Sequence, residues 1–153
     1  VGSLIPDLDS FISFVTGGRS GPPRGLMHSL LGAVTLDTFL AVLVTILLYP
    51  LMISWIFKLE KKEVIEKCRV SGMLVLSALV GSLSHVLIDS TMHEYNPLLY
   101  PFMNESFDAL VFMNNWLLAS VIVHTVLLGL LLAIFIIEIR KGTEGFWKRL
   151  LIG

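Results

Sequence analysis

Residues 109–137 read ALVFMNNWLLASVIVHTVLLGLLLAIFII, without a single Lys, Arg, Asp or Glu. Two further stretches, residues 38–57 and 70–88, are equally free of these residues. A helix needs roughly 20 apolar residues to cross the hydrocarbon core of a bilayer. The three stretches therefore predict three membrane-spanning helices, of which the second is only just long enough.

The composition agrees with a membrane location. Of the 153 residues, 55% are hydrophobic and 15% are charged, whereas a soluble domain carries about 25% charged residues. A soluble protein of this size has no room for three helices that are hydrophobic on all sides. We expect an all-α integral membrane helical bundle in a single domain, residues 1–153. Residues 1–27 form an outer N-terminal loop, and residues 28–58, 70–91 and 109–140 form the transmembrane helices, the first kinked at Pro50.

Basic residues predict the orientation. Nine of the eleven Lys and Arg residues fall in the loop 58–69 and the tail 140–149, and such residues mark the cytoplasmic side. The N-terminal segment and the loop 91–108 then face outward from the plasma (inner) membrane. All four histidines lie on that outer side or in the outer half of a helix: His28, His85, His93 and His124.

Some partners are excluded and others are expected. The net charge of −1 offers no basic surface for nucleic acid, and the lone Cys68 excludes an internal disulfide. The bilayer is the expected partner. Ala33, Asp37 and Ala41 form a small row on the face of the first helix opposite His28. We expect a further N-terminal helix, missing before Val1, or a second copy of the chain to cover that face.

The strongest chemical signal lies in the second helix. His85 and Asp89 are four residues apart and share a helix face, which His93 joins if the helix continues. Imidazole nitrogen and carboxylate oxygen are ligands for a transition metal such as zinc. Ionisable groups within a membrane span are functional candidates by default. The alternative is a buried His–Asp pair that satisfies itself.

Two weaker motifs precede the first helix. Arg24 and His28 lie at its start, where a helix N-terminus and a fixed cation favour a phosphate. Asp7 and Asp9, separated by one residue, suit a shared metal or a division between ligand and base. We expect the donors to converge to within roughly 5 Å of one point, since metal–ligand bonds are near 2 Å. Ser29 or Ser84 is expected to orient the imidazoles.

The motifs together resemble a known family. Pro6-Asp7-x-Asp9, Arg24-Gly25-x-x-His28-Ser29, Ser84-His85-x-x-x-Asp89-Ser90 and Pro97-Leu98-x-Tyr100-Pro101-Phe102 follow one another along the chain. This order looks like the YdjM-like family of membrane-bound metal-dependent hydrolases, related to zinc-dependent phospholipase C and P1-type nucleases. The resemblance covers residues 2–102. It implies that His85 and Asp89 bind metal, with His28 and an N-terminal aspartate as partners.

The sequence thus predicts a metal-dependent hydrolase at the outer membrane interface, acting on phosphodiester or phospholipid headgroups. The expected metal is a divalent ion, zinc by the resemblance, held by Asp7, His28, His85, Asp89 and His93. Asp9 and Glu94 are the expected proton acceptors, and Arg24 the expected phosphate-binding group. One alternative is a non-catalytic protein whose His/Asp cluster is a structural metal or polar staple. An ion pathway is disfavoured, because the cytoplasmic halves of the helices are nearly bare of ionisable residues.

Overall fold

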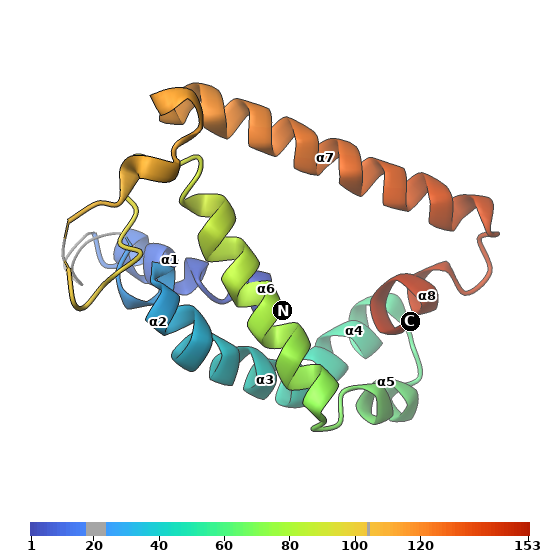
Figure 1. Cartoon of the computed structure of the whole chain (residues 1–153). Helices are drawn as coiled ribbons and strands as arrows, with labels where there is room; N and C mark the ends of the chain where they lie inside the picture. Colours follow the sequence, from blue (N-terminus) through green and yellow to red (C-terminus); the bar gives the residue numbers. More distant parts are fainter. Residues whose placement is uncertain (18–23, 104) are drawn as a thin grey trace.

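The computed structural model describes residues 1–17, 24–103 and 105–153. Within these ranges the regular structure is entirely helical. Three helical segments are long and apolar enough to cross a membrane, namely Leu30–Leu47, Gly72–Asp89 and Trp116–Arg140. The predicted all-α membrane fold with three spanning helices is therefore confirmed (Figure 1).

The chain begins with η1 (Gly2–Leu4), α1 (Asp7–Val15) and η2 (Leu26–His28). The first span combines α2 (Leu30–Gly32), the π-helical turn η3 (Ala33–Asp37) and α3 (Thr38–Leu47). After it come α4 (Tyr49–Phe57), α5 (Lys61–Lys67) and the second span, α6 (Gly72–Asp89). The loop after α6 leads through η4 (Asp108–Leu110) and η5 (Phe112–Asn114) to the third span, α7 (Trp116–Arg140), and to α8 (Phe146–Ile152).

Local chemistry sets the ends of the first span. The Ser29 side chain accepts a hydrogen bond from the Gly32 N–H at 3.0 Å and so caps the helix start. The helix breaks at Leu48, and Pro50 lies in the first turn of α4, where its missing N–H costs nothing. Figure 1 shows α4 turning out of the line of α3. Lys58, with a left-handed backbone (φ 53°), ends α4.

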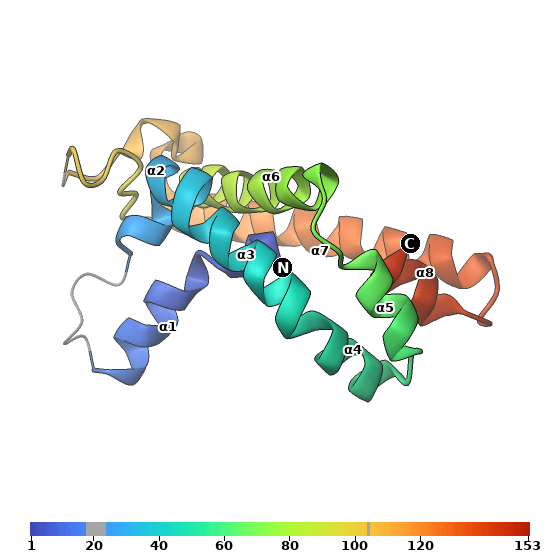
Figure 2. The ribbon, with the colours of Figure 1, turned by 90° about the horizontal axis from the view of Figure 1, so that it is seen from below.

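Residues 1–27 were predicted to form an outer loop. In the part that the structure describes, they instead include η1, α1 and the start of η2. Gly2 lies against the middle of α6, and its carbonyl accepts a hydrogen bond from Ser82 Oγ at 3.2 Å. A Cβ on Gly2 would come within 2.6 Å of the Ala78 carbonyl oxygen, and a Cβ on Gly81 within 3.2 Å of Gly2 Cα. Small residues on both segments allow this close approach. Figure 2 shows the N-terminus beside α3 and α6.

The small row on the first span is already covered by the chain itself. Ala33, Asp37 and Ala41 each have 0% exposed surface. Ala41 packs with Ile5 and Ala78, and Ala33 packs in a second cluster with residues of α6 and of the loop after it. The expectation that a missing helix or a second copy covers this face was wrong, because η1 and α6 fill it.

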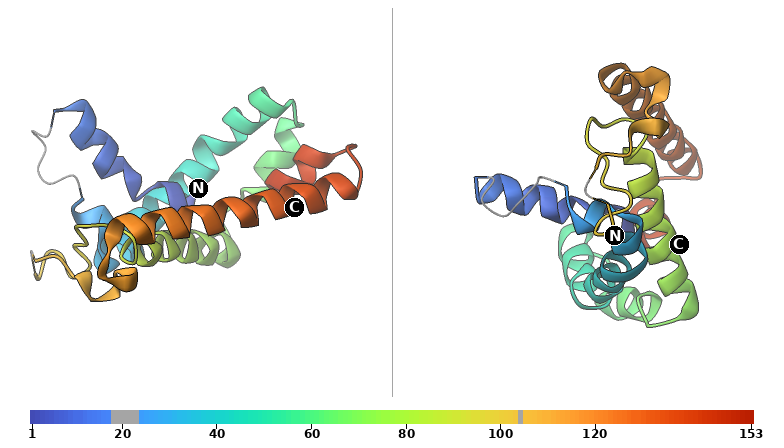
Figure 3. Two further views of the ribbon diagram at one scale, coloured as in Figure 1. Left: turned by 90° about the horizontal axis from the view of Figure 1, so that it is seen from above. Right: turned by 60° about the vertical axis from the view of Figure 1, so that its left-hand side comes forward.

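The third span starts later than predicted. Residues 109–114 lie in short turns, with positive φ at Met113 and Asn114, and the Asn115 side chain caps α7 by accepting from the Leu118 N–H at 3.1 Å. Of the residues of α7, Ala119 alone is buried. Figure 3 shows α7 extended alongside the rest of the molecule, while α1 projects away from it. The apolar surface of α7 is thus available to a bilayer.

Candidate metal centre

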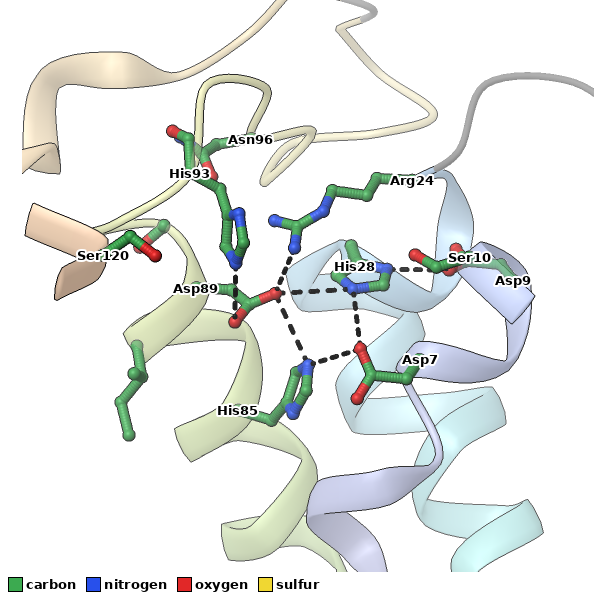
Figure 4. Close-up of polar contacts among 12 residues, drawn as sticks. Asp7, Asp9, Ser10, Arg24, His28, His85, Asp89, His93, Asn96 and Ser120 are labelled. Carbon is green, nitrogen blue, oxygen red and sulfur yellow. Dashed lines mark hydrogen bonds and ion pairs between the residues drawn. The ribbon is translucent and has the colours of Figure 1, made fainter. Parts of the chain in front are cut away.

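Three separate segments bring four side chains together at one end of the spans. Asp7 lies in the first turn of α1, His28 ends η2, and His85 and Asp89 lie one turn apart near the end of α6. One donor atom from each of the four lies within 4.8 Å of the others. Figure 4 shows these side chains pointing toward one another. The expected convergence is confirmed for these four residues.

Four of the six distances between donors suit a single tetrahedral ion. His28 Nε2 lies 3.7 Å from Asp7 Oδ1 and 3.5 Å from Asp89 Oδ2. His85 Nε2 lies 3.4 Å from Asp7 Oδ1 and 3.5 Å from Asp89 Oδ2. Ligands bound at about 2.0–2.2 Å in a tetrahedron are about 3.3–3.6 Å apart. Two imidazole nitrogens and two carboxylate oxygens therefore stand close to the spacing that zinc requires.

Burial also favours a ligand for these atoms. Among the described residues, His28 Nε2, His85 Nε2 and Asp89 Oδ2 are buried without a hydrogen-bond partner of good geometry. His28 is 3% exposed and Asp89 is 6% exposed. Buried polar atoms are normally satisfied, and an exception calls for an explanation such as an ion. The donor set thus fits a divalent metal in its chemistry as well as in its spacing.

Asp9 lies on the far side of the His28 ring from the other donors. Its Oδ1 is 2.8 Å from His28 Nδ1, and its Oδ2 accepts a hydrogen bond from the Gly25 N–H at 2.9 Å. A carboxylate on the second ring nitrogen fixes the orientation and the tautomer of a metal-binding histidine. Ser29 and Ser84 were expected to orient the imidazoles, but their hydroxyl groups donate elsewhere. The Ser29 hydroxyl donates to the Leu26 carbonyl oxygen, and the Ser84 hydroxyl donates to the Gly81 carbonyl oxygen.

The surrounding carboxylates change the protonation of His28. Burial lowers the pKa of His28, but its hydrogen-bonding contacts with Asp89 and Asp9 outweigh burial and raise that pKa to about 9. With no metal bound, the imidazole therefore carries a proton at neutral pH and balances part of the negative charge. Metal binding requires the neutral ring and must displace that proton.

Arg24 and His93 both lie close to the Asp89 carboxylate. Arg24 Nη2 lies 2.9 Å from Asp89 Oδ2, and His93 Nε2 lies 3.6 Å from the other oxygen, Oδ1. His93 follows the end of α6 and lies outside the group of four donors. Burial, with the nearby Arg24 charge, lowers the pKa of His93. His93 thus faces Asp89 as a largely neutral side chain.

A cavity of about 520 Å³ opens onto the donors. Arg24, His93 and His124 line it together with Asp7, His85 and Asp89. His124 Nδ1 lies 2.7 Å from the Ser120 carbonyl oxygen, one turn earlier in α7. Glu94 lines a different, smaller pocket with Asp108 and Trp116, and its side chain is exposed. The cavity therefore combines three of the four donor residues with Arg24 and two further histidines.

Sequence reasoning placed Asp37 on a face left open for another helix, whereas the structure buries it within the chain. Asp37 is fully buried, and neither carboxylate oxygen has a hydrogen-bond partner among the described residues. It interacts electrostatically with Asp9, His28 and His85. His28 does not belong to the same regular helix as Asp37, because Ser29 is extended and a π-turn follows. Counting helical residues from His28 therefore does not give the orientation of Asp37. The signal available in the sequence was a single charged residue within an apolar span.

The family model described as YdjM inner membrane protein matches residues 1–150. The resemblance drawn from the four motifs is thereby confirmed at the level of the family, and the relation to phospholipase C and P1 nuclease stays a prediction. No curated protein and no solved structure matches the chain.

Proposed function

The chain belongs to the YdjM inner membrane protein family, and we propose that it is a metal-dependent hydrolase of phosphodiesters or phospholipid headgroups. The observation that carries this proposal is the convergence of donor atoms from Asp7, His28, His85 and Asp89 within 4.8 Å. Such a group of converging donors beside a cavity, with the His28, His85 and Asp89 side chains largely buried, is a default candidate for an active site.

The proposed metal is zinc. Two imidazoles and two carboxylates whose donor atoms lie within 4.8 Å of one another match its preferred ligands, and the same ligands also serve manganese or iron. When bound, such an ion supplies a nucleophile at neutral pH by lowering the pKa of water from about 15.7 toward 7. Asp7 is the most exposed of the four, with a side chain 54% exposed, and so leaves this centre open to the cavity.

The remaining residues have proposed roles around that centre. Asp9 holds the His28 ring, which supports a positioning role more strongly than the role of base expected from sequence. Arg24 lines the cavity and provides a guanidinium for an anionic phosphoryl oxygen. His93 contacts Asp89 and orients its carboxylate. Glu94 as proton acceptor stays a prediction, since its side chain faces another pocket.

We propose that the centre faces the extracytoplasmic side. The support is the charge distribution, with nine of eleven basic residues in the loop 58–69 and the tail 140–149. The donors lie near the end of α6, at Asp89, and the basic loop precedes its start at Gly72. The centre and the basic loop are therefore at opposite ends of one spanning helix.

Metal analysis combined with an assay tests the function. Purified wild type should hold about one zinc, manganese or iron per chain and hydrolyse bis(p-nitrophenyl) phosphate, because four donors suit one ion. His85→Ala and Asp89→Ala should lose both, while Glu105→Gln, an exposed outer-loop control, should keep both. A wild type without stoichiometric metal would overturn the proposal. Metal in the wild type without turnover of any phosphoester would instead favour the structural staple.

A further inference from the structure

We propose that the substrate is a membrane lipid with an anionic phosphoryl head, whose chain lies in an apolar groove between α6 and α7. This inference rests on the proposed hydrolase and narrows its substrate class to lipids. It is carried by the position of the groove relative to the metal centre.

The groove is an apolar cavity of about 430 Å³. Its α6 side is formed by Leu87 and Ile88, followed by Thr91, and its α7 side includes Ile122, Val126 and Leu127. Leu87 is 46% exposed and Val126 is 55% exposed, so the groove is open along its length. An open apolar groove offers nothing to a fully water-soluble phosphodiester.

The groove continues into the cavity of the metal centre. Ile88 and Leu127 line both spaces, one from α6 and the other from α7. On one side of this pair lie His85, Asp89 and Arg24, and on the other side only the apolar groove and Thr91. A ligand that fills both spaces must be polar at one end and apolar at the other.

The depth of the groove matches lipid chains. Its α7 side lies six to eleven residues beyond the helix start at Trp116. At 1.5 Å per residue this is roughly 9–17 Å inside the outer end of the helix. Trp116 suits the membrane–water interface, and the residues beyond it lie at the level of acyl chains. Lipid can therefore enter the groove sideways from the outer leaflet.

Charge complementarity selects an anionic head. Arg24 is the cation that lines the cavity, and it already lies 2.9 Å from a carboxylate oxygen of Asp89. A divalent ion held by the donors adds positive charge at the same point. A phosphoryl group between the two would meet positive charge on both sides, which favours phosphatidylglycerol or phosphatidic acid over a neutral headgroup.

The experiment maps where a lipid chain binds. Protein in nanodiscs, with and without zinc, is irradiated with a phosphatidylglycerol analogue that carries a diazirine in its acyl chain. Crosslinks located by mass spectrometry should concentrate on residues 87–91 and 122–127. Val126→Trp, which fills the groove, should reduce these crosslinks about tenfold, and Leu128→Trp on the same helix outside the groove should not.

A kinetic comparison separates the two proposals. Val126→Trp should lower kcat/KM for long-chain phosphatidylglycerol, relative to that for bis(p-nitrophenyl) phosphate, by about tenfold. Crosslinks spread evenly along α7, or an unchanged ratio, would overturn the lipid inference while the hydrolase stands. Groove crosslinks without hydrolysis of either substrate would overturn the hydrolase instead. A photoreactive amino acid at position 126 that captures a second copy of the chain would show that protein, not lipid, fills the groove.

Discussion

His28 Nδ1 lies 2.8 Å from Asp9 Oδ1, on the side of the imidazole that faces away from the other donors. The opposite nitrogen, Nε2, points toward Asp7, His85 and Asp89 (Figure 4). The His28 imidazole thus lies between the Asp9 carboxylate and the other three donors. In metal sites this arrangement fixes the ring and strengthens its basicity.

Replacing Asp9 tests that arrangement. Asp9→Asn should reduce zinc affinity by about 10- to 100-fold, because the ring loses its charged partner while all four donors remain. Competition titration with a chromogenic chelator measures the change, and Glu105→Gln provides the control. A variant with unchanged affinity would show that the contact between Asp9 and His28 does not support metal binding.

Metal binding should release a proton from His28. Its pKa of about 9 means that the ring is protonated at pH 7.5 and must become neutral to bind metal. Apparent zinc affinity should therefore rise with pH until about pH 9. Calorimetric titrations in buffers of different ionisation enthalpy should give about one released proton or more per ion. An enthalpy independent of the buffer would exclude a protonated His28 in the metal-free protein.

Arg24 should affect metal and substrate in opposite ways. Arg24→Gln removes a positive charge 2.9 Å from Asp89, so zinc should bind more tightly, by about tenfold. The same change should raise KM for an anionic phosphoester, because the guanidinium no longer contacts it. Arg24→Lys should keep the metal affinity near wild type and recover KM only in part. A parallel loss of metal and substrate affinity would argue against this role.

Substitutions of Asp37 and Asp108 compare the stability contribution of a carboxylate without hydrogen bonds with that of a carboxylate that accepts them. Asp37 is buried with both oxygens unpaired, whereas Asp108 accepts hydrogen bonds from Asn96 and Ser106. With chelator present, Asp37→Asn should leave the unfolding temperature unchanged or higher, since an unpaired buried charge is removed. Asp108→Asn should lower stability by about 1 kcal/mol. Thermal unfolding in detergent measures both, and a large loss in Asp37→Asn would reveal a partner for its carboxylate.

Site-directed labelling tests the orientation. In a Cys68→Ser background, Glu105→Cys should react with an impermeant maleimide from outside, and Lys62→Cys only after the membrane is opened. Both positions are exposed, while Asn96 in the same outer loop is 3% exposed and unsuitable for labelling. The reverse pattern would place the metal centre on the cytoplasmic side.

The sequence alone determined the class of protein and two of the four donors. Charge-free stretches long enough to cross a bilayer need no tertiary information, because each helix satisfies its own backbone in lipid. Helical spacing also placed His85 and Asp89 on one face of α6 before any contact was known. Asp7 and His28 followed only as candidates from short motifs and from the resemblance.

Tertiary structure decided what spacing along the chain cannot encode. It brought Asp7 and His28 to the end of α6, and it assigned Asp9 to the His28 ring rather than to the cavity. It also buried Asp37 within electrostatic reach of His28 and His85, which helical counting did not predict because a capped helix start and a π-turn interrupt the regular helix. Gly2 and Gly81 let η1 and α6 approach closely. These two segments thereby cover the face of the first span for which the sequence suggested another helix. These outcomes depend on contacts between distant segments, whereas the three spans depend only on local hydrophobicity.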